Sequence, residues 1–254
     1  MLAILLGTLI GLSLGMIGGG GSILTVPILV FIMGQDAHLA TATSLAVVGA
    51  TSAAGAFPHW RAGRVRFRTA IPFGIAGILG AFAGAWVNHL LPGAVILVLF
   101  GFLMLAVAAR MFLSPKIPAK LVDGRAIRDD WVPMIATGLS VGVMTGFFGV
   151  GGGFLIVPAL VVVLGLNMRT AVGTSLVVIA INSASGLAAH LRYGSLDLMM
   201  AALFTVGGAV GAFVGAALAG KLDEQRLQRG FATFVAILGI WMVIDNFPVG
   251  SLVT

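Results

Sequence analysis

Cysteine is absent from the sequence, and charged side chains are scarce. The 254 residues include no Cys, and only 9% of them are Asp, Glu, Lys or Arg. Without thiols the chain has no disulfide bonds, no thiolate metal sites and no relay through sulfur. Soluble domains carry about 25% charged residues, so this scarcity of charge excludes an ordinary soluble domain.

Apolar residues and glycine dominate the composition instead. Hydrophobic residues make up 59% of the chain, and 37 residues are glycine. This composition predicts an all-α, polytopic protein of the lipid bilayer in which small residues let helices approach closely. The net charge of +6 falls in short loops beside apolar segments, so it indicates membrane orientation and not a nucleic-acid partner.

The chain reads as two transmembrane repeats joined by a polar linker. We expect the first repeat over residues 1–113, a cytoplasmic linker over 114–131 and the second repeat over 132–254. Each repeat would hold a glycine-broken helix pair and three further transmembrane helices. Whether the first two segments of a repeat cross or re-enter is open. The apolar segments are 1–17, 22–34, 40–58, 69–88, 92–113, 132–149, 154–165, 170–190, 198–219 and 228–246.

The two repeats align without a gap when the chain is shifted by 131 residues. More than a third of positions 15–84 are identical in this register, including Pro27 with Pro158 and Thr43-Ser44 with Thr174-Ser175. Paired, interrupted hydrophobic segments in two halves are typical of a transporter's binding site.

Glycine runs interrupt each repeat near its start. The candidates are Gly19, Gly20 and Gly21 in the first repeat and Gly151, Gly152 and Gly153 in the second. A broken backbone at membrane depth survives only inside protein or beside a wet cavity, and a helix that restarts there presents N–H groups to an anion. Alternatively, the glycines only allow close helix packing. Gly153 aligns with Ser22, so we expect that position to tolerate a side chain.

Hydroxyl and amide side chains follow the glycine breaks. Thr43, Ser44, Thr174 and Ser175 would donate to a bound anion, or else satisfy a carbonyl of their own helix. Asn182 lies two turns further along, and a membrane-buried amide is costly unless it has a partner.

Histidine and arginine recur at the ends of two long apolar segments. His59 and Arg61 align with His190 and Arg192, and a proton-coupling or gating role is possible because histidine titrates near neutral pH. The alternative is a histidine that faces lipid headgroups or caps a helix. His38 and His89 have no counterpart, so the sequence gives them no role.

The positive-inside rule orients the chain. If each repeat crosses an odd number of times, the second is inverted relative to the first. All but one of the 14 Lys and Arg residues then lie in the cytoplasm, the exception being Arg192. Both termini are then predicted outside the inner membrane.

The motifs of common enzyme classes are missing. The sequence contains no HExxH motif, no carboxylate pair in an apolar segment and no nucleotide-binding glycine register, so we expect neither catalysis, nor a metal, nor a cofactor.

The doubled motif resembles the sulfite exporter TauE/SafE family of bacterial membrane permeases. The resemblance rests on GVGGGFLIVPAL at 149–160, AVGTS at 171–175, NSASG at 182–186 and the matching first-half residues 18–63. It implies transport of sulfite, sulfonates or related small anions across the inner membrane.

We therefore expect a secondary transporter that exports a small sulfur-containing oxyanion as one repeat rocks against the other. A passive anion channel or a permease for another small organic anion are the alternatives. The sequence leaves the coupling ion and assembly into a homo-oligomer open.

Overall fold

The computed structural model describes most of the two repeats. Among the predicted features, Gly20, Gly151, Gly152, nearly all of the linker and much of segment 228–246 lie outside the described residues. The described residues are 1–19, 21–113, 131–148, 153–162, 164, 166, 168–192, 195–218, 232–233, 236–237 and 239–245.

Every regular element in the described ranges is helical, which confirms the all-α prediction. Helix α6 begins at Trp131, a residue that the sequence analysis assigned to the linker. The elements are α1 (Leu2–Ile17), α2 (Ser22–Pro27), η1 (Ile28–Ile32), α3 (Ala37–Arg61), α4 (Phe67–Leu90), α5 (Gly93–Leu113), α6 (Trp131–Phe148), α7 (Gly153–Val162), α8 (Met168–His190) and α9 (Leu198–Leu218).

Length and composition make this a polytopic membrane protein. Four of the described helices are long and apolar enough to cross a bilayer: α3, α4, α8 and α9. Their outward side chains are large and apolar, as at Leu79, which is 68% exposed, and Val206, which is 59% exposed. Such surfaces are stable against lipid tails and not against water.

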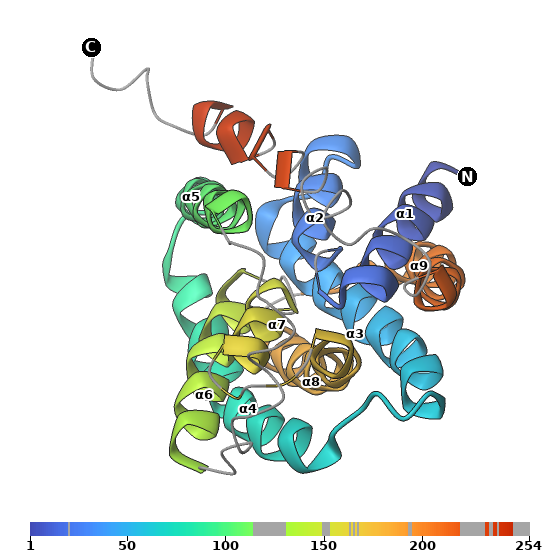
Figure 1. Cartoon of the computed structure of the whole chain (residues 1–254). Coiled ribbons are helices and arrows are strands. Elements are labelled where there is room, and N and C mark those ends of the chain that lie inside the picture. Colours follow the sequence, from blue (N-terminus) through green and yellow to red (C-terminus); the bar gives the residue numbers. More distant parts are fainter. Residues whose placement is uncertain are drawn as a thin grey trace, which may run out of the picture.

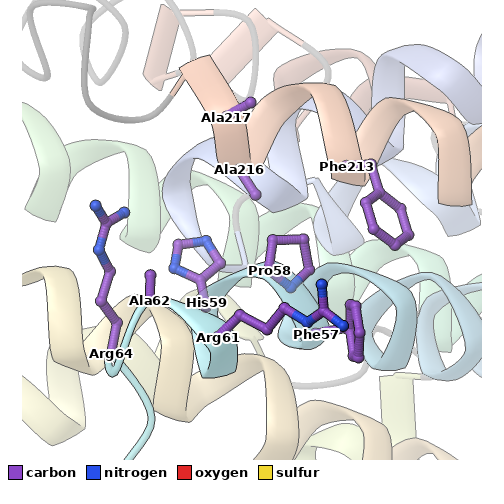
Figure 2. A pocket seen from close by; sticks show the side chains of 9 residues that line it. All are labelled: Phe57, Pro58, His59, Arg61, Ala62, Arg64, Phe213, Ala216 and Ala217. Carbon is purple, nitrogen blue, oxygen red and sulfur yellow. The ribbon is translucent and has the colours of Figure 1, made fainter.

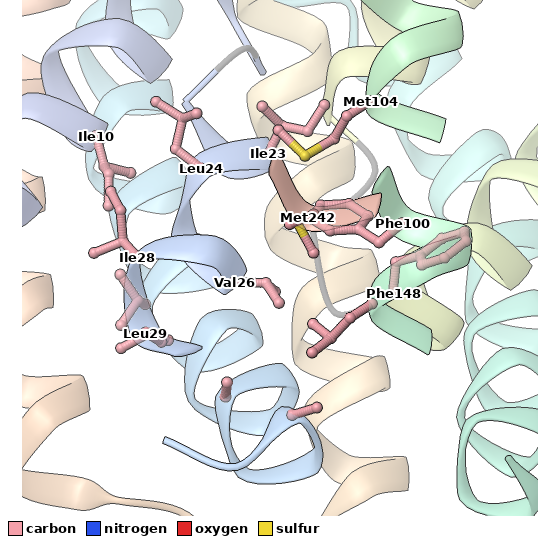
Figure 3. Close-up of a cluster of buried hydrophobic side chains, with 14 of the residues drawn as sticks. Ile10, Ile23, Leu24, Val26, Ile28, Leu29, Phe100, Met104, Phe148 and Met242 are labelled. Atoms are coloured by element: carbon pink, nitrogen blue, oxygen red, sulfur yellow. The ribbon is translucent and has the colours of Figure 1, made fainter. Parts of the chain in front are cut away.

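The short helix after the first glycine run lies inside the protein. All six residues of α2 are buried, and its apolar side chains belong to a cluster that also takes in Ile10, Phe100 and Phe148 (Figure 3). Pro27 lacks an N–H, so the chain continues as the wider π-helix η1, in which the Met33 amide bonds the Ile28 carbonyl at 3.1 Å. This broken helix is therefore covered by protein, as a membrane requires.

The two halves interlock through their first helices. Helix α1 packs on α9 and helix α6 packs on α4, so each half supplies the partner for the other's first helix (Figure 1). Glycines bring these backbones together, and a Cβ added at any of them would meet a neighbouring backbone. They are Gly7, Gly11 and Gly15 on α1, Gly138, Gly142 and Gly146 on α6, Gly80 and Gly84 on α4, and Gly207, Gly211 and Gly215 on α9.

Helices α3 and α8 form the centre. They pack on each other, α3 also contacts α9, and α8 also contacts α4 (Figure 1). The packing is repeated at the 131-residue offset: Gly7 lies against Phe204 as Gly138 lies against Phe73, and Gly55 lies against Leu176 as Gly186 lies against Leu45. The side chains on α3 and α8 therefore decide what the centre of the molecule can bind.

Candidate functional site

The first glycine break begins at Gly18. This residue ends α1 with a left-handed backbone, φ 80°, and its amide closes the last turn on the Leu14 carbonyl at 2.8 Å. A side chain is strained at that φ, so glycine is needed for the conformation itself. Gly21, by contrast, has an ordinary helical φ of −70°.

Gly19 and Gly153 bring the two breaks together. A Cβ on Gly153 would stand 2.6 Å from the Gly19 Cα, and a Cβ on Gly19 would overlap the Gly153 backbone. The expectation that Gly153 tolerates a side chain is therefore wrong. The alignment pairs Gly153 with Ser22, but its neighbour in space is Gly19.

Amides near the first break already have acceptors in the chain. The amides of Ser22 and Leu24 each donate at 3.2 Å, to the carbonyls of Gly19 and Gly21. A Cβ on Gly21 would meet the α1 backbone, 2.9 Å from the Leu14 nitrogen. Close packing, the alternative to anion binding, therefore accounts for Gly21.

The two Thr-Ser pairs have different surroundings. In the second repeat, the Thr174 hydroxyl accepts from the Arg66 amide at 3.0 Å, and the Ser175 hydroxyl lies 2.7 Å from the Gly18 carbonyl. In the first repeat, the fully buried Thr43 and Ser44 hydroxyls find no hydrogen-bond partner among the residues that the structure describes. Thr43 and Ser44 are thus the pair with donors to offer.

A buried polar line continues along the two central helices. Asn182 is fully buried and lies against Gly77 of α4, while its counterpart Thr51 lies against Gly208 of α9. Within the described ranges, the side chains of this line have no hydrogen-bond partners; they are those of Thr51, Ser52, Asn182 and Ser183. Unpartnered buried polar groups are costly, and their number here calls for a ligand or a path.

His59 and His190 lie in the interior, each only 2% exposed, so they do not face lipid headgroups. The His59 Nε2 is 3.2 Å from the carbonyl of Gly15, and the His190 Nε2 is 2.8 Å from the carbonyl of Gly146. A carbonyl only accepts, so Nε2 carries the proton in both rings. Each histidine therefore caps the last turn of its own repeat's first helix.

A cavity of about 460 Å³ opens beside His59 at the end of α3 (Figure 2). The Arg61 guanidinium lies 4.7 Å from the centre of the Phe57 ring, and the side chain of Arg64 is half-buried. Among the described residues, no acidic side chain lines this cavity. The lining residues are Phe57, Pro58, His59, Arg61, Ala62, Arg64, Phe213, Ala216 and Ala217.

The cavity adjoins the second repeat's Thr-Ser pair. A Cβ on Gly173 would contact both the Arg64 backbone and the His59 Cβ, so the start of α8 lies against the end of α3. Cationic side chains, a hydroxyl pair and a glycine break thus meet at one end of the molecule.

Arg192, the counterpart of Arg61, is exposed, and its guanidinium lies 5.5 Å from the centre of the Phe82 ring.

Sequence reasoning missed two histidines. The His38 and His89 rings stack with centres 5.5 Å apart, and His89 lies 5.1 Å from His190. The repeat alignment hid them because neither has a counterpart. His38 lies at the start of α3 and His89 at the end of α4, and no local spacing in the sequence marks either position.

Comparisons with known proteins identify the family of this chain. The profile of a family described as "Sulfite exporter TauE/SafE" matches residues 3–242. A "Probable membrane transporter protein" of Xylella fastidiosa is 34% identical over 93% of this chain and 92% of its own. The "Probable membrane transporter protein YdhB" of Bacillus subtilis is 28% identical over 96% of this chain and 100% of its own. No solved structure matches. The chain therefore belongs to the sulfite exporter TauE/SafE family of membrane transporters.

Proposed function

We propose that the protein is a secondary transporter that exports a small sulfur-containing oxyanion, sulfite or an organosulfonate, across the bacterial inner membrane. The observation that carries this proposal is the cavity with Arg61 and Arg64 in its wall and no acidic side chain among its described lining residues. Cationic groups beside low-dielectric walls attract an anion and raise its local concentration.

The anion's path continues inward from this cavity along hydroxyl groups. Gly173, two residues before Ser175, lies against Arg64 and His59 of the cavity wall. The unpartnered polar line of Thr51, Ser52, Asn182 and Ser183 runs along the central helices. A small oxyanion accepts hydrogen bonds from hydroxyl and amide donors, and bonds to a charged ligand contribute about 1.5–3 kcal/mol each. Thr43 and Ser44 offer the same donors near the other end of α3.

The interlocked packing supports a proposal for which parts move. The glycine contacts of α1 with α9 and of α6 with α4 hold backbones too close to slide freely. We therefore assign the motion to these mixed pairs, which rock as units against the α3–α8 centre. Rocking of one whole repeat against the other, the motion expected from the sequence, would pull these pairs apart.

A counterflow assay tests the proposed function. Purified protein in liposomes preloaded with unlabelled sulfite should accumulate labelled sulfite transiently, and thiosulfate, sulfoacetate, taurine and lactate inside should be compared as exchange partners. Liposomes without protein and an inorganic cation tracer are the controls.

The assay also separates the alternatives. A passive channel dissipates gradients without the overshoot that marks exchange. A permease for another organic anion exchanges lactate in preference to the sulfur compounds. Absence of exchange with every anion tested would reject the proposal.

A further inference from the structure

We propose that His38, His89 and His190 form a proton-loading site at the end of the molecule where α3 begins and α8 ends. This inference rests on the proposed function, because the proton loaded here would drive transport of the anion. The three rings come from three helices, α3, α4 and α8, and their centres follow one another at 5.5 Å and 5.1 Å.

Solvent exposure falls along the series from His38 and His89 to His190. The rings of His38 and His89 are half-buried, whereas His190 is 2% exposed. A proton from the aqueous side therefore meets His38 and His89 first and reaches His190 last. Ring centres about 5 Å apart are close enough for transfer through one bridging water molecule or a small side-chain rotation.

Hydrogen bonds show which ring nitrogen of His38, at the outer end of the series, carries a proton. The buried Asn88 amide donates through Nδ2 to the Phe147 carbonyl at 2.7 Å, which turns its Oδ1 towards His38. That oxygen lies 3.0 Å from the His38 Nδ1, and an amide oxygen only accepts. The His38 Nδ1 therefore carries a proton, and its Nε2 is the nitrogen that takes up another.

His190, at the inner end of the series, has one ring nitrogen that can accept a proton. The His190 Nε2–H donates to Gly146, while its Nδ1 is buried and has no hydrogen-bond partner in the described part of the chain. An incoming proton binds at Nδ1 and makes an imidazolium, and the Nε2–H bond stays in place. When the site opens to the other side, the same proton leaves from Nδ1, and the ring is neutral again.

The end of α6 favours the charged ring. His190 and Asn88 bind the carbonyls of Gly146 and Phe147, which belong to the last turn of that helix and to the negative end of its dipole. This placement offsets part of the cost of burying a cation. The charge then lies against the last turn of α6.

Other charged groups at this end already have contacts. Asp36 caps α3 through the His38 amide at 2.8 Å, and Asp197 accepts from Gln35 at 3.0 Å. The Arg192 guanidinium lies over Phe82. Helices α6 (Trp131–Phe148) and α7 (Gly153–Val162) contain no ionisable side chain. Among the described residues, the three histidines are the ionisable groups at this end whose rings follow one another into the interior.

The transport test compares His190→Gln with the parent in liposomes that are given labelled sulfite from outside. Glutamine keeps an amide donor for the Gly146 carbonyl but cannot carry a proton. With the membrane potential clamped and a pH gradient imposed, the parent should accumulate sulfite, and His190→Gln should lose at least about tenfold of that accumulation, since each 1.4 kcal/mol of lost coupling is tenfold. Counterflow at equal pH should persist in the variant.

A second variant tests the outer rings. His38→Asn keeps an amide nitrogen for Asn88 and should slow proton-driven accumulation severalfold without changing counterflow. Ser140→Ala is the matched control and should behave as the parent, because the exposed Ser140 hydroxyl bonds to the Ala136 carbonyl of its own helix. Accumulation at the parent's level in both histidine variants would overturn the proposal.

A substrate-free measurement separates the two hypotheses. Nitrogen NMR of histidine-labelled protein, titrated from about pH 8 to about pH 4, should show the His190 Nδ1 taking up a proton, with a curve that changes in His38→Asn. Loss of counterflow in the parent would reject the anion proposal alone. A His190 ring that stays neutral over the whole range would reject the proton site, whatever the transport result.

Discussion

Gly19 and Gly153 touch through their backbones, although 134 residues separate them in the chain. Each stands at the glycine break of its own repeat, and neither has room for a methyl group. The contact fixes the distance between the starts of α2 and α7, so the two breaks are one structural unit.

Gly19→Ala should destabilise the protein because its Cβ overlaps the Gly153 backbone, which cannot rotate away as a side chain can. Overpacking of this kind costs about 1–3 kcal/mol, measured as a fall in melting temperature in detergent. The control is Gly93→Ala, whose Cβ would meet only the Ala37 Cβ at 3.2 Å. A melting temperature equal to the control's would show that the breaks are not in tight contact.

Thr43→Val combined with Ser44→Ala should reduce anion exchange while leaving stability unchanged or slightly higher. The two buried hydroxyls have no partners among the described residues, so removing them takes away a desolvation cost and two donors to the anion. The control is Thr41→Val, which loses a 2.7 Å bond to the Ala37 carbonyl and should still transport. Parental exchange rates in the double variant would remove these hydroxyls from the anion path.

Arg64→Gln should weaken the apparent affinity for sulfite roughly fivefold, which corresponds to about 1 kcal/mol between unit charges near water. The effect should shrink as salt rises, because exposed charges are screened beyond about 10 Å at 0.1 M. Arg68→Gln, outside the cavity wall, is the matched control. Equal affinities for the two variants across a salt series would exclude the cavity as the entrance for the anion.

Membrane orientation can be read with single cysteines, since the chain has none of its own. A membrane-impermeant maleimide should label Leu2→Cys and Thr254→Cys from outside the cell. Lys120→Cys should react only after the membrane is opened. Labelling of Thr254→Cys and Lys120→Cys from the same side would contradict inverted repeats.

Local sequence signals predicted the helices well and their partners poorly. Apolar runs and glycine breaks placed the described segments within a few residues, as for α3, predicted at 40–58 and found at Ala37–Arg61. Those signals depend on neighbours along the chain. The contact of Gly153 with Gly19 depends on how the halves interlock, which no local pattern encodes.

For the candidate site, too, local sequence signals found the residues but not their partners in space. Repetition singled out Thr43, Ser44, Thr174 and Ser175, but it treated the two pairs as equals. The Arg66 amide and the Gly18 carbonyl engage only the second pair, and this difference arises from a loop and a helix end in the other half of the chain. His38 and His89 were missed because a repeat alignment finds only residues that occur twice.

The exchange of partners between the halves also determines the order of assembly in the cell. Helix α1 (Leu2–Ile17) leaves the ribosome long before α9 (Leu198–Leu218), on which it packs. At about 5–20 residues per second, α1 waits on the order of 10–40 s before its partner exists. Throughout that interval its glycine face has only lipid or an insertase to cover it. A chain cut in the linker should therefore yield two fragments that are degraded when made alone and rescued when made together.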